Sequence, residues 1–196
     1  MKIVYTTLFL ACVISSCNSN GNSEIEPLNS KDSKATIVRD IKLLTDSLMA
    51  MYSLPQEILR AFTKEDLVKY KTNLSVARME LINLNLKFYK SYPEDTLSAY
   101  CLSDVQQLYD ATGAFSKALS YGDTIASQYP DFTNLVFILE KNAAILDFNV
   151  QERDTAQIRK AYERIIALPN ISKESKTVYL ERIATLDIPL KDFLGK

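Results

Sequence analysis

The chain has 196 residues, with 23 Lys and Arg against 24 Asp and Glu, no His and no Trp. A net charge of −1 argues against nucleic-acid binding, which needs a strong basic excess. Because there is no histidine, Ser-His-Asp and Cys-His catalysis and His-Glu-x-x-His zinc chemistry are excluded. No spacing of carboxylates or lysines indicates another reaction, so we expect a non-enzymatic protein with no metal and no cofactor.

The N-terminal residues have the pattern of a secretory signal peptide. Lys2 supplies a positive start, and residues 8–14 form an uninterrupted apolar run that is followed by Ser15-Ser16-Cys17. A helix that spans a bilayer needs about 20 apolar residues, so this run is too short to be one. We therefore expect a signal peptide over residues 1–16.

The sequence Ile14-Ser15-Ser16-Cys17 resembles the lipobox of bacterial lipoproteins. In that family the cysteine is lipidated and becomes the first mature residue, which implies lipidation at Cys17. The resemblance also implies the outer membrane, because Asn18 stands where an aspartate commonly retains the protein at the inner membrane. The uncharged stretch 18–23 lacks the acidic run that marks surface export, which favours a periplasm-facing position. Two alternatives remain open: an ordinary signal peptide with an incidental Cys17, and lipidation at Cys12.

Residues 17–33 are rich in Asn, Ser and Gly and have few large apolar side chains, so we expect the lipidated cysteine to be followed by a disordered tether. From residue 34 to residue 196 the apolar residues recur with helical spacing, which predicts one all-α domain. Cys101 would be the remaining thiol of the mature chain. Its apolar neighbours indicate a small buried residue rather than a reactive group.

The first expected helix covers residues 35–52, and a short helical turn follows Pro55. Thr63 and Asp66 form a capping-box pattern at the start of a long helix that ends before Pro93. This long helix carries two apolar stripes, one of which includes Met79 and Ile82, so we expect neighbouring helices on both of its sides. The later helices are expected at residues 96–111, 115–128, 132–148, 155–168 and 173–186, which gives about seven helices in all.

A repeated sequence ends several of these helices. Residues 88–93, Phe-Tyr-Lys-Ser-Tyr-Pro, are echoed by residues 125–130, Ile-Ala-Ser-Gln-Tyr-Pro, and more weakly by residues 165–169. The prolines of the three sequences are separated by 37 and 39 residues. This spacing is close to the period of about 34 residues that is typical of tetratricopeptide repeats.

Residues 99–130 resemble a tetratricopeptide repeat, in which two antiparallel helices form one unit of a solenoid. The positions that match the repeat pattern are Tyr109, Gly113, Phe115, Ala118 and Pro130. Two positions depart from it, because Gln106 replaces a small glycine and Gly122 replaces a large apolar residue. The resemblance implies a solenoid of helical hairpins whose first helices line a concave groove for a partner. The implied groove residues are Tyr100, Ser103, Gln107, Asp110, Asn134, Phe137 and Lys141.

A lipobox followed by such repeats resembles the outer-membrane lipoproteins that scaffold envelope machinery, such as those of the barrel-assembly BamD type. The resemblance implies a non-enzymatic scaffold or adaptor that holds an envelope protein or peptide in its groove. The alternative is a surface-exposed lipoprotein that binds nutrients or glycans, in which tyrosines would contact sugars rather than fill the core. An enzyme that uses carboxylates or a lysine is the third hypothesis.

Overall fold

The computed structural model describes residues 33–149 and 153–193, and within these two ranges every regular element is a helix. This confirms the all-α prediction for that part of the chain. The predicted signal peptide, Cys17 and the predicted tether up to residue 32 lie outside the described residues. None of the helices in the described ranges is long and apolar enough to cross a membrane.

The longer helices lie close to where the sequence predicts them, and α2 and α9 are short. Their bounds are α1 Lys34–Tyr52, α2 Gln56–Ala61, α3 Lys64–Ser91, α4 Thr96–Ala111, α5 Phe115–Gln128, α6 Leu135–Ala144, α7 Thr155–Ile166, α8 Lys173–Ala184 and α9 Leu190–Phe193. A π-helical turn, Ile145–Asn149, directly continues α6.

Local signals in the sequence explain where the helices begin and end. The capping box at the start of α3 is present, with the Thr63 backbone N–H donating to Asp66 Oδ2 at 3.0 Å and the Asp66 N–H donating to Thr63 Oγ1 at 3.1 Å. Gly113, between α4 and α5, has φ of +75°, a conformation that a residue without Cβ adopts easily. Pro93 and Pro130 each follow the C-cap tyrosine of a helix.

The sequence prediction for residues 132–148 is wrong in its details. Phe132 lies in a turn, in which its N–H donates to the Tyr129 carbonyl at 3.0 Å, and the helix begins only at Leu135. The predicted C-terminal part of this helix is the π-helical turn. That turn carries Asp147, which is buried at 1 % exposure and bound by two arginines.

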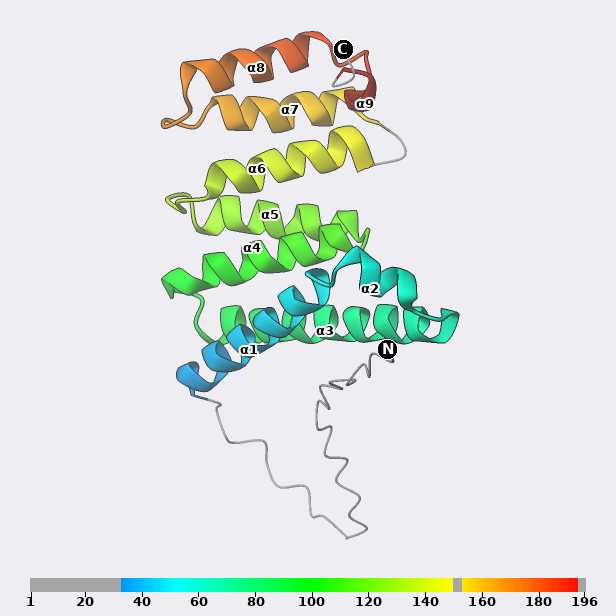
Figure 1. The fold of residues 1–196 in the computed structure, drawn as a ribbon. Helices are drawn as coiled ribbons and strands as arrows, with labels where there is room; N and C mark the ends of the chain where they lie inside the picture. The colour runs from blue at the N-terminus through cyan, green and yellow to red at the C-terminus, as the bar shows by residue number, and fades with distance from the viewer. Residues whose placement is uncertain (1–32, 150–152, 194–196) are drawn as a thin grey trace, which may run out of the picture. The chain divides into compact units, whose positions relative to one another are not determined.

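The helices are stacked in chain order. Each helix from α4 to α7 packs mainly on the helix before it and the helix after it (Figure 1). At the two ends of this series, α3 packs on α1 and α4, and α8 packs on α7. Figure 1 shows α3 to α8 as successive layers, with the connections α3–α4, α5–α6 and α7–α8 on one side of the stack and α4–α5 on the other. Side chains on equivalent helices of successive pairs, such as α4 and α6, therefore come close together.

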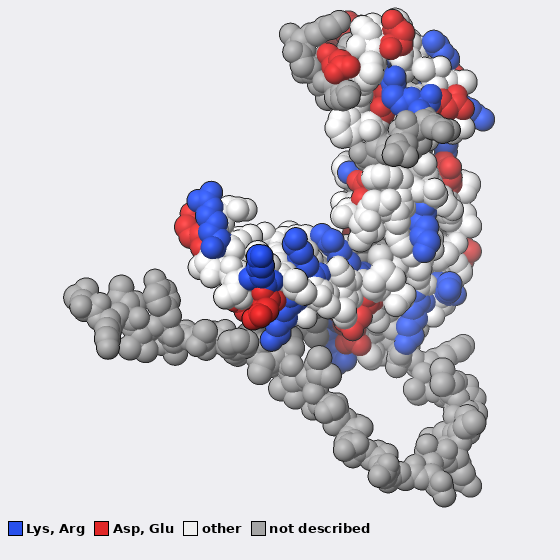
Figure 2. Space-filling view, turned by 90° about the vertical axis from the view of Figure 1, so that its right-hand side faces the viewer, with Lys and Arg blue, Asp and Glu red and all other residues white. Residues whose placement is uncertain are grey.

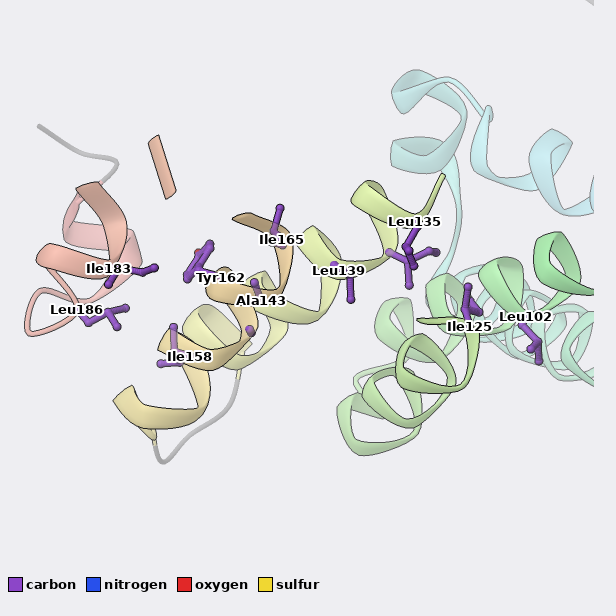
Figure 3. Packing of buried hydrophobic residues seen from close by; sticks show 12 residues of the cluster. Leu102, Ile125, Leu135, Leu139, Ala143, Ile158, Tyr162, Ile165, Ile183 and Leu186 are labelled. Carbon is purple, nitrogen blue, oxygen red and sulfur yellow. The ribbon is translucent and has the colours of Figure 1, made fainter. Parts of the chain in front are cut away.

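Two groups of buried apolar side chains run through the stack. One extends from Leu102 and Ile125 in α4 and α5 to Ile183 and Leu186 at the C-terminal end (Figure 3). The other joins α1, α3, α4 and α5 and includes Leu81 and Val105. Burying each such side chain contributes about 1.5–3 kcal/mol, so these two groups hold the layers together.

One of the two predicted stripes on α3 is buried only in part. Ile82 is fully buried, but Met79, which the pattern placed on the same stripe, is 47 % exposed. The reason is that α3 has α1 and α4 as its packing neighbours, and Met79 is left in contact with solvent. The prediction that Cys101 is a small buried residue is confirmed by its 7 % exposure, and this burial raises the pKa of its thiol to about 12.

Candidate functional site

The residues that the sequence places in a groove come from two helices of adjacent hairpins. Tyr100, Ser103, Gln107 and Asp110 lie on α4, Phe137 and Lys141 lie on α6, and Asn134 is the residue that precedes α6. The two helices are joined here by an ion pair between Lys141 Nζ and Asp110 Oδ2 at 3.1 Å. The predicted residues therefore come from two helices that are in contact at this ion pair, and we call this set of residues the α4/α6 face.

These residues differ in how much of their surface they offer to a partner. Tyr100 and Phe137 are 45 % and 44 % exposed, which is unusual for large aromatic side chains. Gln107 and Asn134 are also exposed. Ser103 is only 6 % exposed, and Gln107 Nε2 donates to its hydroxyl at 3.4 Å, so Ser103 supports the face from below rather than forming its surface.

A pocket of about 350 Å³ lies beside Tyr100, at the end of the face where α4 begins. Its lining includes Thr96 and Tyr100 from α4 and residues 128–133 from the end of α5 and the turn that follows it. Phe132 packs edge-on against Tyr100, with their ring centres 4.9 Å apart and an angle of 84° between the ring planes. This pocket could not be predicted from the sequence, because it forms only where two hairpins are in contact.

The walls of the pocket are fixed by hydrogen bonds to the preceding hairpin. The Tyr129 hydroxyl donates to the Pro93 carbonyl at 2.6 Å, which joins the two repeated Tyr-Pro sequences directly. The Tyr89 hydroxyl donates to Gln128 Oε1 at 2.8 Å. The repeated Tyr-Pro sequences are the feature of the amino-acid sequence from which this contact could have been predicted.

Asp104 brings an unbalanced negative charge to the α4/α6 face. It lies one helical turn after Tyr100 and is partly buried, and among the described residues it has no hydrogen-bond or ion-pair partner. Burial raises the pKa of its carboxyl to about 6. From Thr96 to Phe137 the chain has four aspartates and one basic residue, Lys117, whose ammonium lies 5.0 Å from the centre of the Tyr109 ring.

The two departures from the repeat pattern meet inside the stack. Gln106 Nε2 donates to Asn142 Oδ1 at 2.7 Å and to the Ile138 carbonyl at 3.3 Å, which connects α4 to α6. A Cβ atom on Gly122 of α5 would lie 2.5 Å from Gln106 Nε2 and 2.4 Å from Asn142 Oδ1. Compared with the repeat pattern, the larger residue is therefore on α4, as Gln106, and the small residue is on α5, as Gly122. Gly122 leaves the space that the Gln106 side chain occupies.

A second buried polar group lies near the C-terminal end of the stack. Asp147 accepts hydrogen bonds from Arg182 Nε at 2.7 Å, from Arg153 Nη2 at 2.7 Å and from the Tyr162 hydroxyl at 3.2 Å. Burial disfavours the charged form of Asp147, but the two arginines outweigh this effect and hold its pKa below the ordinary value. With all three side chains engaged and Asp147 almost fully buried, this group joins helices rather than forming a reaction centre.

Comparison with known proteins identifies no relative. No protein-family model matches the chain, and neither a curated protein nor a solved structure matches it. Within the described ranges, no three His, Cys, Asp or Glu side chains are placed to hold a metal ion. The geometry of the site is therefore what indicates its function. It consists of an aromatic pocket, two exposed aromatic rings and the carboxylate of Asp104, which has no partner among the described residues.

Proposed function

We propose that the protein is a non-enzymatic scaffold lipoprotein that binds a protein or peptide partner on its α4/α6 face. In this proposal, lipidated Cys17 anchors the chain in the outer membrane, facing the periplasm, and the stacked helices form a tetratricopeptide-like solenoid. The stacking of α3 to α8 in chain order and the contact between the Tyr-Pro sequences support this arrangement.

The observation that carries the proposal is the recurrence of an exposed aromatic side chain. Tyr100 and Phe137 are 37 residues apart, the same spacing as Pro93 and Pro130, so they occupy equivalent places in successive hairpins. Both rings are nearly half exposed, and unlike the exposed rings of Tyr52 and Phe148 they recur at the spacing of the repeat. Exposed aromatic side chains are the residues that most often dominate binding energy at protein interfaces.

Site-specific photocrosslinking in intact cells tests this proposal. A photoreactive phenylalanine analogue at position 100 or 137 should yield a discrete crosslinked product, because each ring would lie against the partner. The control is the same analogue at Ser127, an exposed residue of α5, with Thr124, a partly exposed residue of the same helix, as a second control position; neither belongs to the α4/α6 face. Equal crosslinking from the control positions, or no product from either aromatic position, would argue against a binding role for this face.

A further inference from the structure

We propose that the partner segment carries an aromatic side chain and, two positions away in its sequence, a lysine or arginine. The aromatic ring would occupy the pocket beside Tyr100, and the cation would lie over Asp104. This inference rests on the proposed function and specifies the chemistry of the segment that the α4/α6 face binds.

The size and lining of the pocket fit one aromatic side chain. A cavity of about 150 Å³ is sufficient for benzene, so the 350 Å³ beside Tyr100 accommodates a phenylalanine, tyrosine or tryptophan side chain. Tyr100, Tyr129 and Phe132 surround it with aromatic carbon, and Pro130 adds an aliphatic surface. Rings in such surroundings adopt edge-to-face contacts of the kind that Tyr100 and Phe132 already make.

The pocket is held in shape before any partner arrives. Tyr129 is hydrogen-bonded to the Pro93 carbonyl, and the adjacent Gln128 is hydrogen-bonded to Tyr89, so the connection after α5 is fixed at two points. Binding then requires little ordering of the protein, and less of the contact energy is lost to conformational entropy. A preformed pocket therefore favours one anchoring side chain over a diffuse contact.

Asp104 determines the charge of the expected segment. It is partly buried and without a partner among the described residues, whereas Asp110 on the same helix is neutralised by Lys141. A lysine or arginine of the partner would pair with Asp104, and an acidic side chain would be repelled by it. Of the four aspartates from Thr96 to Phe137, Asp110 is paired with Lys141 and Asp123 with Arg164. Asp104 and Asp131, which lines the pocket, are the carboxylates that favour a basic segment.

The spacing of the two partner residues follows from geometry. Tyr100 and Asp104 are four residues apart on a helix, so their Cβ atoms are separated by about 6 Å along the surface. In an extended peptide, side chains two positions apart point to the same side and are about 7 Å apart. An aromatic side chain packed against Tyr100 at the mouth of the pocket and a basic side chain two positions away, in either chain direction, therefore match the separation of Tyr100 and Asp104.

Fluorescence polarisation with the full chain in detergent tests the inference. The probes are labelled nine-residue peptides of Ser and Gly with one central triplet: Phe-Ser-Lys, Phe-Ser-Glu or Ala-Ser-Lys. We expect Phe-Ser-Lys to bind about tenfold more tightly than either of the other peptides, because each of them lacks one anchor. Equal affinity for Phe-Ser-Lys and Phe-Ser-Glu, or no binding of Phe-Ser-Lys at millimolar concentration, would overturn the inference.

Two variants assign the preference to its residues. Asp104→Asn should remove the preference for Lys over Glu and keep the preference for Phe over Ala, while Tyr100→Ala should weaken both Phe peptides. The matched controls are Asp187→Asn and Phe148→Ala, which remove an exposed carboxylate and an exposed ring elsewhere. Retention of the full Lys preference in Asp104→Asn, in a variant whose circular dichroism melting curve shows a cooperatively folded chain, would contradict the assignment.

The outcome separates this inference from the proposed function. If photocrosslinking at positions 100 and 137 yields a partner but the peptides show no charge or ring preference, the inference fails and the scaffold proposal stands. If neither crosslinked product nor peptide binding is found, both fail.

Discussion

At the residue scale, Gly122 and Gln106 determine how closely α5 approaches α4 and α6. Gln106 is fully buried, and its side chain fills the space where a Cβ on Gly122 would lie. The sequence identified both positions as departures from the repeat pattern, but their compensation is visible only in three dimensions. The hydrogen bond from Gln106 to Asn142 then connects one hairpin to the next.

Gly122→Ala should destabilise the protein. Helix propensity alone would stabilise it by about 1 kcal/mol, because alanine replaces a glycine inside α5. The new Cβ displaces Gln106 and Asn142, however, and the loss of their buried hydrogen bond costs about 1–3 kcal/mol. We therefore expect a net decrease in the free energy of unfolding, measured by urea denaturation.

The double variant Gln106→Ala/Gly122→Ala should be more stable than the sum of the two single changes predicts, because truncating Gln106 frees part of the space. Gly113→Ala is the control glycine: its added Cβ has no neighbour within 4 Å, but its φ of +75° makes the change unfavourable. Gln106→Ala should not rescue Gly113→Ala. If Gly122→Ala instead increased the free energy of unfolding, the side-chain amides of Gln106 and Asn142 would be displaced without loss of stability, and the prediction would be wrong.

Asp104→Asn should stabilise the protein at neutral pH. An acid whose pKa is raised in the folded state binds protons more readily there, so folding becomes less favourable as the pH rises from the ordinary Asp value of 3.8 to about 6. Removing the charge should increase the unfolding free energy by about 1–2 kcal/mol at pH 7 and leave it unchanged near pH 4. Denaturation curves at both pH values measure this, and an equal effect at both would contradict it.

At the element scale, the sequence predicts the helices well because their signals are local. The capping box of Thr63, the turn at Gly113 and the prolines after α3 and α5 act within a few residues of the helix ends. The π-helical turn after α6, the burial of Asp147 and the pocket beside Tyr100 depend on contacts between residues far apart in the chain. No periodicity in a single helix carries that information, so these features were missed.

Arg182→Met should destabilise the C-terminal layers strongly. Asp147 would remain buried with only part of its hydrogen bonding, and removing one partner of a buried ion pair costs about 3–5 kcal/mol. Thermal unfolding compares this variant with Arg159→Met, which removes an exposed arginine of the neighbouring α7. Equal melting temperatures for the two variants would show that the Asp147 group contributes little.

At the scale of the whole molecule, charge is unevenly distributed along the chain. Residues 33–91 have ten Lys and Arg against six Asp and Glu, whereas residues 92–196 have eleven against fifteen. The visible surface in Figure 2 accordingly shows many basic side chains over the lower helices. The proposed partner-binding face thus belongs to the acidic part, and the proposed anchor precedes the basic part.

Cys17→Ser should release the protein from the membrane, because a serine cannot carry the acyl chains that the lipobox resemblance implies. Ultracentrifugation of lysed cells should find the wild-type chain in the membrane fraction and the variant in the soluble fraction. Unchanged membrane retention would contradict lipid anchoring at Cys17. Protease treatment of intact cells should leave the wild-type chain uncut, since digestion would instead favour the surface-exposed alternative.

The claim that the α4/α6 face binds a partner is tested most directly by the double variant Tyr100→Ala/Phe137→Ala. With the photoreactive analogue at Gln107, an exposed residue of the same face, recovery of the in-cell crosslinked complex should fall about tenfold or more relative to the chain that keeps both rings. The melting temperature should change by only a few degrees, because both rings are nearly half exposed. Phe148→Ala, at a ring that is 59 % exposed outside the face, should leave recovery unchanged. Full recovery with the double variant, or a steep loss of thermal stability that would identify the two rings as core residues, would contradict the account.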